Sequence, residues 1–159
     1  MCQVNVEWLW RVLSQMPIAY IDVRFFAHAT EDVDKVIEAV QHVLPSNHRE
    51  EIMFNRSNLQ GHYGNPITFF EAKIKNKEII RALVENLSSR LSELDKETLS
   101  REIHLHVEKG SLYIRLDKQA ALQGKLKLCT SDPIHIRIRF RKTKIEDIVK
   151  TCRELGMLT

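Results

Sequence analysis

Hydrophobic and polar residues alternate strictly in two stretches of the chain. The stretch "IAYIDVRFFA" has apolar side chains at every second position from Ile21, and "PIHIRIRFRKTK" repeats the pattern from Ile134. Because successive side chains on a strand point to opposite faces of a sheet, the pattern predicts two β-strands with one buried face each. The other face of the second strand carries cationic or imidazole groups about 7 Å apart: His135, Arg137, Arg139 and Arg141.

Three other stretches have apolar residues at helical spacing. A first helix ends at Pro45, and an apolar stripe over 79–94 predicts the longest helix, starting near residue 76. Thr143 and Glu146 match a capping box at the start of a closing helix. Cys152 lies on the apolar side of that helix, so we expect it in the core and not as a reactive thiol.

The remaining elements are predicted strands. They are expected near residues 52–56, 67–74, 102–108, 111–117 and 125–130. The order is then β-α-β-β-α-β-β-β-β-α, which predicts a two-layer α+β fold with a mixed, mainly antiparallel sheet and helices packed on one face. We assign residues 16–159 to a single domain and residues 1–15 to an N-terminal extension of unassigned role.

If helices cover the apolar face of the sheet, the other face is open. Alternation along each predicted strand then places a common set of polar and mostly basic residues on it. The set is Arg24, His104, His106, Tyr113, Arg115, Arg137, Arg139 and Arg141.

Positive charge is concentrated in the part of the chain that contributes most of this face. The net charge of the chain is only +3, but residues 109–144 hold ten Lys and Arg against two Asp, a local +8 that leaves −5 for the rest. Such asymmetry is typical of a nucleic-acid-binding surface, whereas a solvated basic face is the ordinary alternative.

Composition excludes several other classes of protein. With 43% hydrophobic and 28% charged residues, the chain is of the soluble globular class. Its three cysteines form no CxxC pair, so we expect no disulfide framework or zinc knuckle. No apolar run approaches the roughly 20 residues that cross a bilayer, and the N-terminus lacks the basic start of an export signal. We therefore expect a cytoplasmic protein that does not enter membranes.

Two polar loops could hold catalytic groups. "GHYGNP" offers His62, Tyr63 and Asn65, and "LDKQAALQGK" offers Asp117, Lys118, Gln119 and Lys125. Neither contains a nucleophile with its base, a phosphate-binding glycine loop or paired carboxylates. Zinc could in principle bind the imidazoles of His104, His106 and His135, but no carboxylate or cysteine at ligand spacing accompanies them. We expect no catalytic site, no metal and no cofactor.

RNA binding is the function that the residues favour. Arginine makes bidentate contacts to phosphate and stacks on bases, so arginines on the strand at 137–141 suit RNA better than mere solubility requires. The loops at 61–66 and 117–124 add aromatic and hydrogen-bonding groups, and we expect them to lie together in one pocket. The candidate RNA-binding residues are His62, Tyr63, Asn65, Arg115, Lys118, Gln119, Lys125, Arg137, Arg139, Arg141, Lys142 and Lys144.

Three segments also resemble a known family. "GHYGNPI", "YIRLDKQAALQG" and "DPIHIRIRFRKTKIEDIVKTCRELGML" resemble an archaeal family of predicted exosome subunits with an RNA-binding domain, over about residues 16–158. The resemblance implies an α+β fold related to the large-subunit ribosomal protein that binds 5S RNA. It singles out the loop at 61–66 and the segment from Arg115 to Gly124, with His62 where relatives are expected to carry an aromatic residue.

These observations lead to three hypotheses about function. The first is a non-enzymatic RNA-binding protein that holds structured or single-stranded RNA mainly by its phosphates; its narrower form is an accessory subunit of an exosome-like assembly. The second is an assembly subunit whose basic face meets an acidic protein partner. The third, which we favour least, is an RNA-modifying or RNA-cleaving enzyme that uses His62, Asp117 and Lys118. Dimer formation is left open.

Overall fold

Six antiparallel strands form one sheet. The computed structural model describes residues 16–159, so the extension at 1–15 lies outside the described residues. The strand order across the sheet is β2-β3-β1-β6-β5-β4, and each neighbouring pair is antiparallel. The strands are β1 (Ile18–His28), β2 (Asn55–Gln60), β3 (Pro66–Ile74), β4 (Val107–Glu108), β5 (Ser111–Leu116) and β6 (Ile134–Phe140). The predicted α+β class with a mainly antiparallel sheet is confirmed.

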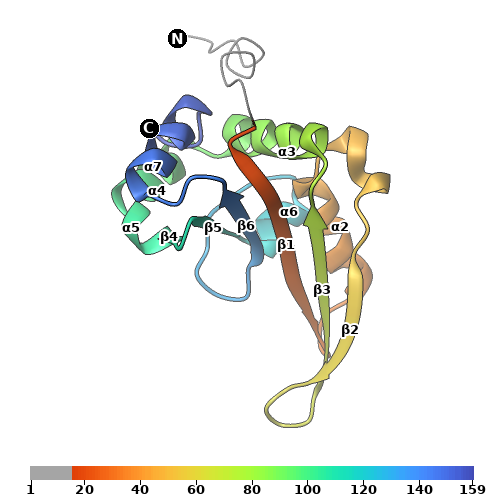
Figure 1. Ribbon diagram of the computed structural model, residues 1–159. Helices are drawn as coiled ribbons and strands as arrows, with labels where there is room; N and C mark the ends of the chain where they lie inside the picture. The colour runs from red at the N-terminus through yellow and green to blue at the C-terminus, as the bar shows by residue number, and fades with distance from the viewer. Residues whose placement is uncertain (1–15) are drawn as a thin grey trace.

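Helices cover one face of this sheet. Figure 1 shows α2 and α6 behind the strands and α3 along one end of the sheet. The helices are α2 (Val33–Val43), α3 (Lys77–Arg90), α4 (Glu93–Arg101), α5 (Ile103–His106), α6 (Lys118–Leu122) and α7 (Ile145–Glu154), with a 3-10 turn, η1, at Ser46–Glu51. The molecule is therefore two-layered, as the sequence predicts.

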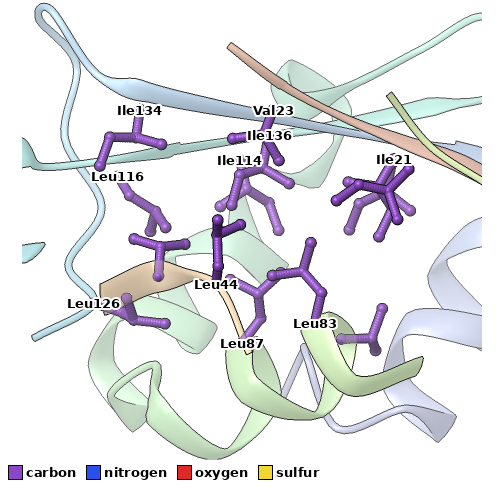
Figure 2. Packing of buried hydrophobic residues seen from close by; sticks show 14 of the residues in the cluster. Ile21, Val23, Leu44, Leu83, Leu87, Ile114, Leu116, Leu126, Ile134 and Ile136 are labelled. Atoms are coloured by element: carbon purple, nitrogen blue, oxygen red, sulfur yellow. The ribbon is translucent and has the colours of Figure 1, made fainter. Parts of the chain in front are cut away.

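The core lies between the two layers. Figure 2 shows Ile21, Val23 and Ile136 pointing from the strands toward Leu83 and Leu87 of α3. All five side chains are fully buried. Burying a side chain of this size contributes about 1.5–3 kcal/mol. The alternating residues of the strands and the helically spaced residues of α3 thus pack into the same apolar layer.

Cys152 belongs to this layer, as expected. Its side chain is fully buried on α7, and burial raises the pKa of its thiol to about 12. A thiol with so high a pKa is a poor nucleophile at neutral pH. The helix itself begins one residue later than the capping box predicts, with Lys144 as its N-cap and no side-chain cap bond.

The longest predicted helix is two helices. Helix α3 ends at Arg90, and the Ser92 hydroxyl then accepts a hydrogen bond from the Asp95 backbone N–H to start α4. Leu91 at the junction is buried and so continues the apolar stripe of α3. Leu94, the last residue of the predicted stripe, is exposed instead. Within 16–159, no helix has the length and apolar character needed to cross a membrane.

Two of the predicted strands are wrong. Residues 103–106 form α5, and only Val107 and Glu108 pair with β5. Ile103 and Val107 pack against the core, but Leu105 between them is exposed, a pattern that a helix accommodates and a half-buried strand does not. The segment at 125–130 makes a single bridge, between Leu128 and Leu116. β2 also begins at Asn55, later than predicted.

Candidate nucleic-acid interface

The sheet face turned away from the helices, here called the open face, carries two rows of charged and aromatic residues. Directly opposite residues on neighbouring strands share a face, so the register defines each row. From β5 to β3 the first row is Arg115, His135, Arg24 and Glu71. The second row, about 7 Å along the strands, is Tyr113, Arg137, Asp22 and Lys73.

The arginines of these rows are held from one side. Arg24 Nε lies 2.9 Å from a carboxylate oxygen of Glu71, and Arg137 Nε donates a hydrogen bond of 3.0 Å to the Ser111 hydroxyl. The guanidinium of Arg137 also lies over the Tyr113 ring, 5.9 Å from its centroid. Such contacts fix the guanidinium planes and leave their other N–H groups available to a ligand.

His135 lies among these cations as a neutral base. Its Nε2 accepts a hydrogen bond of 3.1 Å from Arg115 Nε. Burial, followed by the positive charges of Arg115 and Arg24, lowers the pKa of His135 below its usual value of 6.5. The imidazole is therefore uncharged at neutral pH and becomes a further cation in acid.

A buried carboxylate lies beneath the arginines. Asp22 is only 1% exposed, and its Oδ2 is 3.8 Å from Arg24 and 3.9 Å from Arg137. Neither carboxylate oxygen accepts a hydrogen bond from the part of the chain that the structure describes. Asp22 thus acts on the two arginines by charge alone, and draws both toward the centre of the face.

The predicted RNA-binding residues fall into four groups. Arg115, Arg137 and Arg139 lie on the open face, and Arg141 follows the end of β6, where its Nε donates to the Met16 carbonyl. The other groups are the β2–β3 tip (His62, Tyr63 and Asn65), α6 with the following turn (Lys118, Gln119 and Lys125), and the loop before α7 (Lys142 and Lys144). The last group lies at the end of β6 away from the tip, because Phe140 pairs with the start of β1.

Lys118 is engaged inside the protein. It is 8% exposed, and its Nζ donates to the Phe26 carbonyl at 2.6 Å and to Asp132 Oδ2 at 2.9 Å. Glu31 Oε1 lies 3.2 Å from the same nitrogen, and His28 Nε2 is 3.0 Å from the second Asp132 oxygen. This Lys118 network joins α6, the end of β1 and the turn before β6.

The same network contains a group of metal-type ligands. Ligand atoms of His28, Glu31 and Asp132 lie within 4.8 Å of one another. The Lys118 ammonium, however, already contacts both carboxylates and so supplies the positive charge that a metal ion would bring. The histidines considered in the sequence are not gathered: His104 and His106 are on α5, whereas His135 is on β6.

The two polar loops lie at the same end of the sheet but in different surroundings. Leu116 at the end of β5 pairs with Ile134 at the start of β6, and β3 begins beside the end of β1. Both loops therefore lie at the same end of the strands. Figure 1 shows the β2–β3 tip projecting from the body of the protein, whereas α6 packs behind the sheet. Tyr63 at the tip is 87% exposed. A shared pocket between these loops stays a prediction.

The groups proposed for catalysis have structural bonds. The Asp117 carboxylate caps α6 by accepting from the Ala120 N–H, and Lys118 is held in its network. His62 lies at the exposed tip, where its ring meets Tyr63 edge to face at 4.9 Å between centroids. Asp117 and Lys118 are therefore engaged in contacts within the protein, whereas His62 contacts the ring of the adjacent Tyr63.

Sequence reasoning missed two features of the open face. Phe26 is 39% exposed on the same side of β1 as Arg24, and its ring lies 5.0 Å from that of Phe69 on β3. The alternation of β1 already placed Phe26 on this side, so the signal was present. The pairing with Phe69 required the register of β1 with β3, which the sequence did not supply.

Comparison with known proteins gives the fold and these residues a context. Residues 20–140 match the sequence model of the family described as RNA binding. The chain is 39% identical over 139 residues to RNA-binding protein PAB1135 of Pyrococcus abyssi, covering 84% of this chain and 90% of that protein. The archaeal RNA-binding part of the resemblance is thereby confirmed, while its exosome and ribosomal-protein parts stay predictions.

Solved structures of archaeal proteins share the fold of this chain. The chain superimposes on protein AF2318 of Archaeoglobus fulgidus with a TM-score of 0.75 and 30% identity, covering 87% of this chain and 99% of the other. It also matches Mth689, a DUF54 protein of Methanothermobacter thermautotrophicus, with a TM-score of 0.72 and 28% identity over 87% and 97% of the two chains. The family model spans most of the chain, and the chain therefore belongs to the RNA-binding family that this model describes.

Proposed function

We propose that the protein is a non-enzymatic, cytoplasmic RNA-binding protein that holds RNA on the open face of its sheet. The observation that carries the proposal is the row of Arg115, His135 and Arg24 on three adjacent strands, with Arg137 in the next row. The family described as RNA binding and the name of the Pyrococcus relative support the ligand class.

Charge and shape give the expected mode of binding. The open face has five cationic side chains (Arg24, Lys73, Arg115, Arg137 and Arg139) against the carboxylates of Asp22 and Glu71. Arg137 is diagonal to both Arg24 and Arg115 across the sheet, at about 7–8 Å, a distance at which two long guanidinium side chains can contact one phosphate. Affinity would come chiefly from such phosphate contacts, which carry no direct sequence information.

A matched pair of triple variants tests the proposal. Changing Arg24, Arg115 and Arg137 to Gln removes three cations from the open face, and the control removes three exposed cations from the helical layer, Lys35, Lys150 and Arg153. Both variants have the same net charge. RNA affinity is measured by fluorescence anisotropy over a series of salt concentrations.

The two variants should differ sharply. Loss of three phosphate contacts should reduce the slope of log K against log salt by about 2, at roughly 0.7 per contact for single strands. The control should bind nearly as the unmodified protein does. Equal weakening by both variants would mean that only net charge matters, and an unchanged slope in the first would remove the open face from consideration.

Membership of an exosome-like assembly is a narrower proposal that rests on the sequence resemblance. Its test is purification of the tagged protein from its host with and without nuclease. Exosome subunits that remain after nuclease treatment would support direct association. An acidic partner that remains instead, and that the triple Arg variant loses, would support the protein-assembly alternative.

A further inference from the structure

An aromatic patch adjoins the arginine row on the open face. Phe26 and Phe69 are directly opposite on β1 and β3, with ring centroids 5.0 Å apart and planes at 37°. In the next row along the strands, β1 carries the polar His28, while Ile67 on β3 and Leu59 on β2 are apolar, the latter 46% exposed. The patch therefore has an accessible aromatic ring at one end of a basic surface.

The core does not explain this patch. Phe25, the residue before Phe26, points into the helical layer, where it stacks on Phe70 at 4.7 Å with planes at 8°. Side chains on a strand alternate, so Phe26 and Phe69 point to the opposite, helix-free face. A cross-strand aromatic pair adds some stability to a sheet, but that role does not require a ring to be 39% exposed to solvent.

The position of the patch relative to the cations indicates an occupant. Phe26 follows Arg24 by two residues on the same strand face, a separation of about 7 Å. Arg24 is opposite His135, a neutral base that accepts a hydrogen bond from Arg115, so two arginines of this row lie on one side of the ring. A ligand that spans the two must be anionic at one end and flat and apolar at the other. A nucleotide of unpaired RNA has this character.

We propose that Phe26, supported by Phe69, is a stacking platform for one unpaired base of a single-stranded RNA whose phosphates are held by Arg24, Arg115 and Arg137. This inference rests on the proposed RNA-binding function and narrows its substrate class. Bases within an uninterrupted duplex are stacked on their neighbours and cannot reach the ring. Stacking of this kind accepts any base, because every base has a flat π face.

The experiment compares Phe26→Leu with the unmodified protein, and uses Phe26→Trp as the conservative control. Leucine keeps an apolar side chain but removes the ring. The probes are a labelled oligouridine, which has little structure of its own, and an RNA duplex of equal length, both at one fixed salt concentration. Thermal unfolding of each variant checks that the sheet is intact.

We expect Phe26→Leu to weaken oligouridine binding about tenfold with duplex binding unchanged, and Phe26→Trp to bind both probes as the unmodified protein does. A 2-aminopurine placed in the oligonucleotide should lose fluorescence on binding to the unmodified protein and not on binding to Phe26→Leu. Oligouridine affinity that is the same for all three proteins would overturn the platform.

Other outcomes separate this inference from the function on which it rests. The proposed function fails if the unmodified protein binds neither the oligouridine nor the duplex. It also fails if the triple Arg variant binds these probes as tightly as the unmodified protein. If RNA binding survives but Phe26→Leu abolishes only self-association in sedimentation velocity, the patch is a protein contact and the platform is refuted. Equal weakening of oligouridine and duplex would refute it too, since a stacking site discriminates between them.

Discussion

Replacing Lys118 by Met separates a structural lysine from an RNA-binding one. The sequence placed Lys118 among the RNA contacts, but its ammonium contacts Asp132, Glu31 and the Phe26 carbonyl inside the protein. Methionine has nearly the same length and fills the same space, so the substitution removes the charge and its hydrogen bonds without opening a large cavity.

The structure sets the size of the effect. Removing one partner of a fully buried ion pair costs about 3–5 kcal/mol, whereas an exposed pair contributes about 0.2–1 kcal/mol. Lys118 is buried, but the side chains of Glu31 and Asp132 are 29% and 42% exposed, so water can hydrate the carboxylates left behind. We expect an intermediate loss of about 2–3 kcal/mol, which lowers the Tm of a chain of this size by roughly 4–12 °C.

The assay is thermal unfolding followed by circular dichroism, with RNA affinity measured well below the Tm. Lys125→Met is the matched control, because Lys125 is an exposed lysine shortly after α6. The control should change the free energy of unfolding by less than about 0.5 kcal/mol. If Lys118→Met keeps the Tm of the unmodified protein but loses RNA affinity, the structural interpretation is refuted and Lys118 is a ligand contact.

Three further predictions concern charge and the tip. Because the pKa of His135 is lowered, its imidazole becomes a cation only below about pH 6.5. RNA affinity should therefore rise as the pH falls through this range, and His135→Gln should abolish the rise. The free energy of unfolding should fall over the same range, since the unfolded chain takes up the proton more readily. Asp22→Asn should raise affinity two- to threefold in salt titrations, as a charge about 8 Å from a bound phosphate contributes about 0.5 kcal/mol in water. Tyr63→Ala should preserve the Tm, because its ring is 87% exposed, and a pocket with Gln119 would be refuted if RNA affinity is preserved in both Tyr63→Ala and Gln119→Ala.

The acid stability of the Lys118 network provides another test. Burial raises the pKa of Asp132, but hydrogen bonds from Lys118 and His28 outweigh it, so its pKa is below the ordinary value. A carboxyl with a lowered pKa stabilises the fold above its unfolded pKa, near 4, and this contribution is lost as the pH falls through the folded pKa. Urea unfolding at pH 7 and pH 3 should therefore show a smaller pH effect in Asp132→Asn than in the unmodified protein.

The strongest periodic patterns predicted the fold correctly. The prediction failed where the apolar residues fit both the helical period and the strand period. The alternation of β6 and the stripe of α3 each bury a full apolar layer, so neither has a competing interpretation. Residues 102–108 fit both periods, since Ile103 and Val107 are apolar at a spacing of four, and Leu105 between them gives a spacing of two. Only packing decides, and it left Leu105 outside. The α3–α4 junction was missed because Leu91 continues the stripe across it.

For the candidate site, the sequence predicted faces but not neighbours. Alternation was enough to place Arg24, Arg115 and Arg137 together on the open face. It could not assign the partner of Lys118, because Glu31 and Asp132 are 87 and 14 residues away along the chain and meet only through the fold. A lysine in a polar loop therefore gave the same signal in the sequence as a lysine that binds phosphate.

The buried carboxylate of Asp22 offsets part of the positive charge of the open face. A row made of arginines alone would repel itself, and the carboxylate between Arg24 and Arg137 reduces that repulsion in the absence of a ligand. Its oxygens lie below the guanidiniums and accept no hydrogen bonds from the described chain, so they do not saturate the N–H groups that face outward. A phosphate can thus add to the arginines without displacing Asp22. If the open face binds RNA as proposed, the buried acid should lower its affinity by a small amount while keeping the arginines in position, and the Asp22→Asn salt titration measures that effect directly.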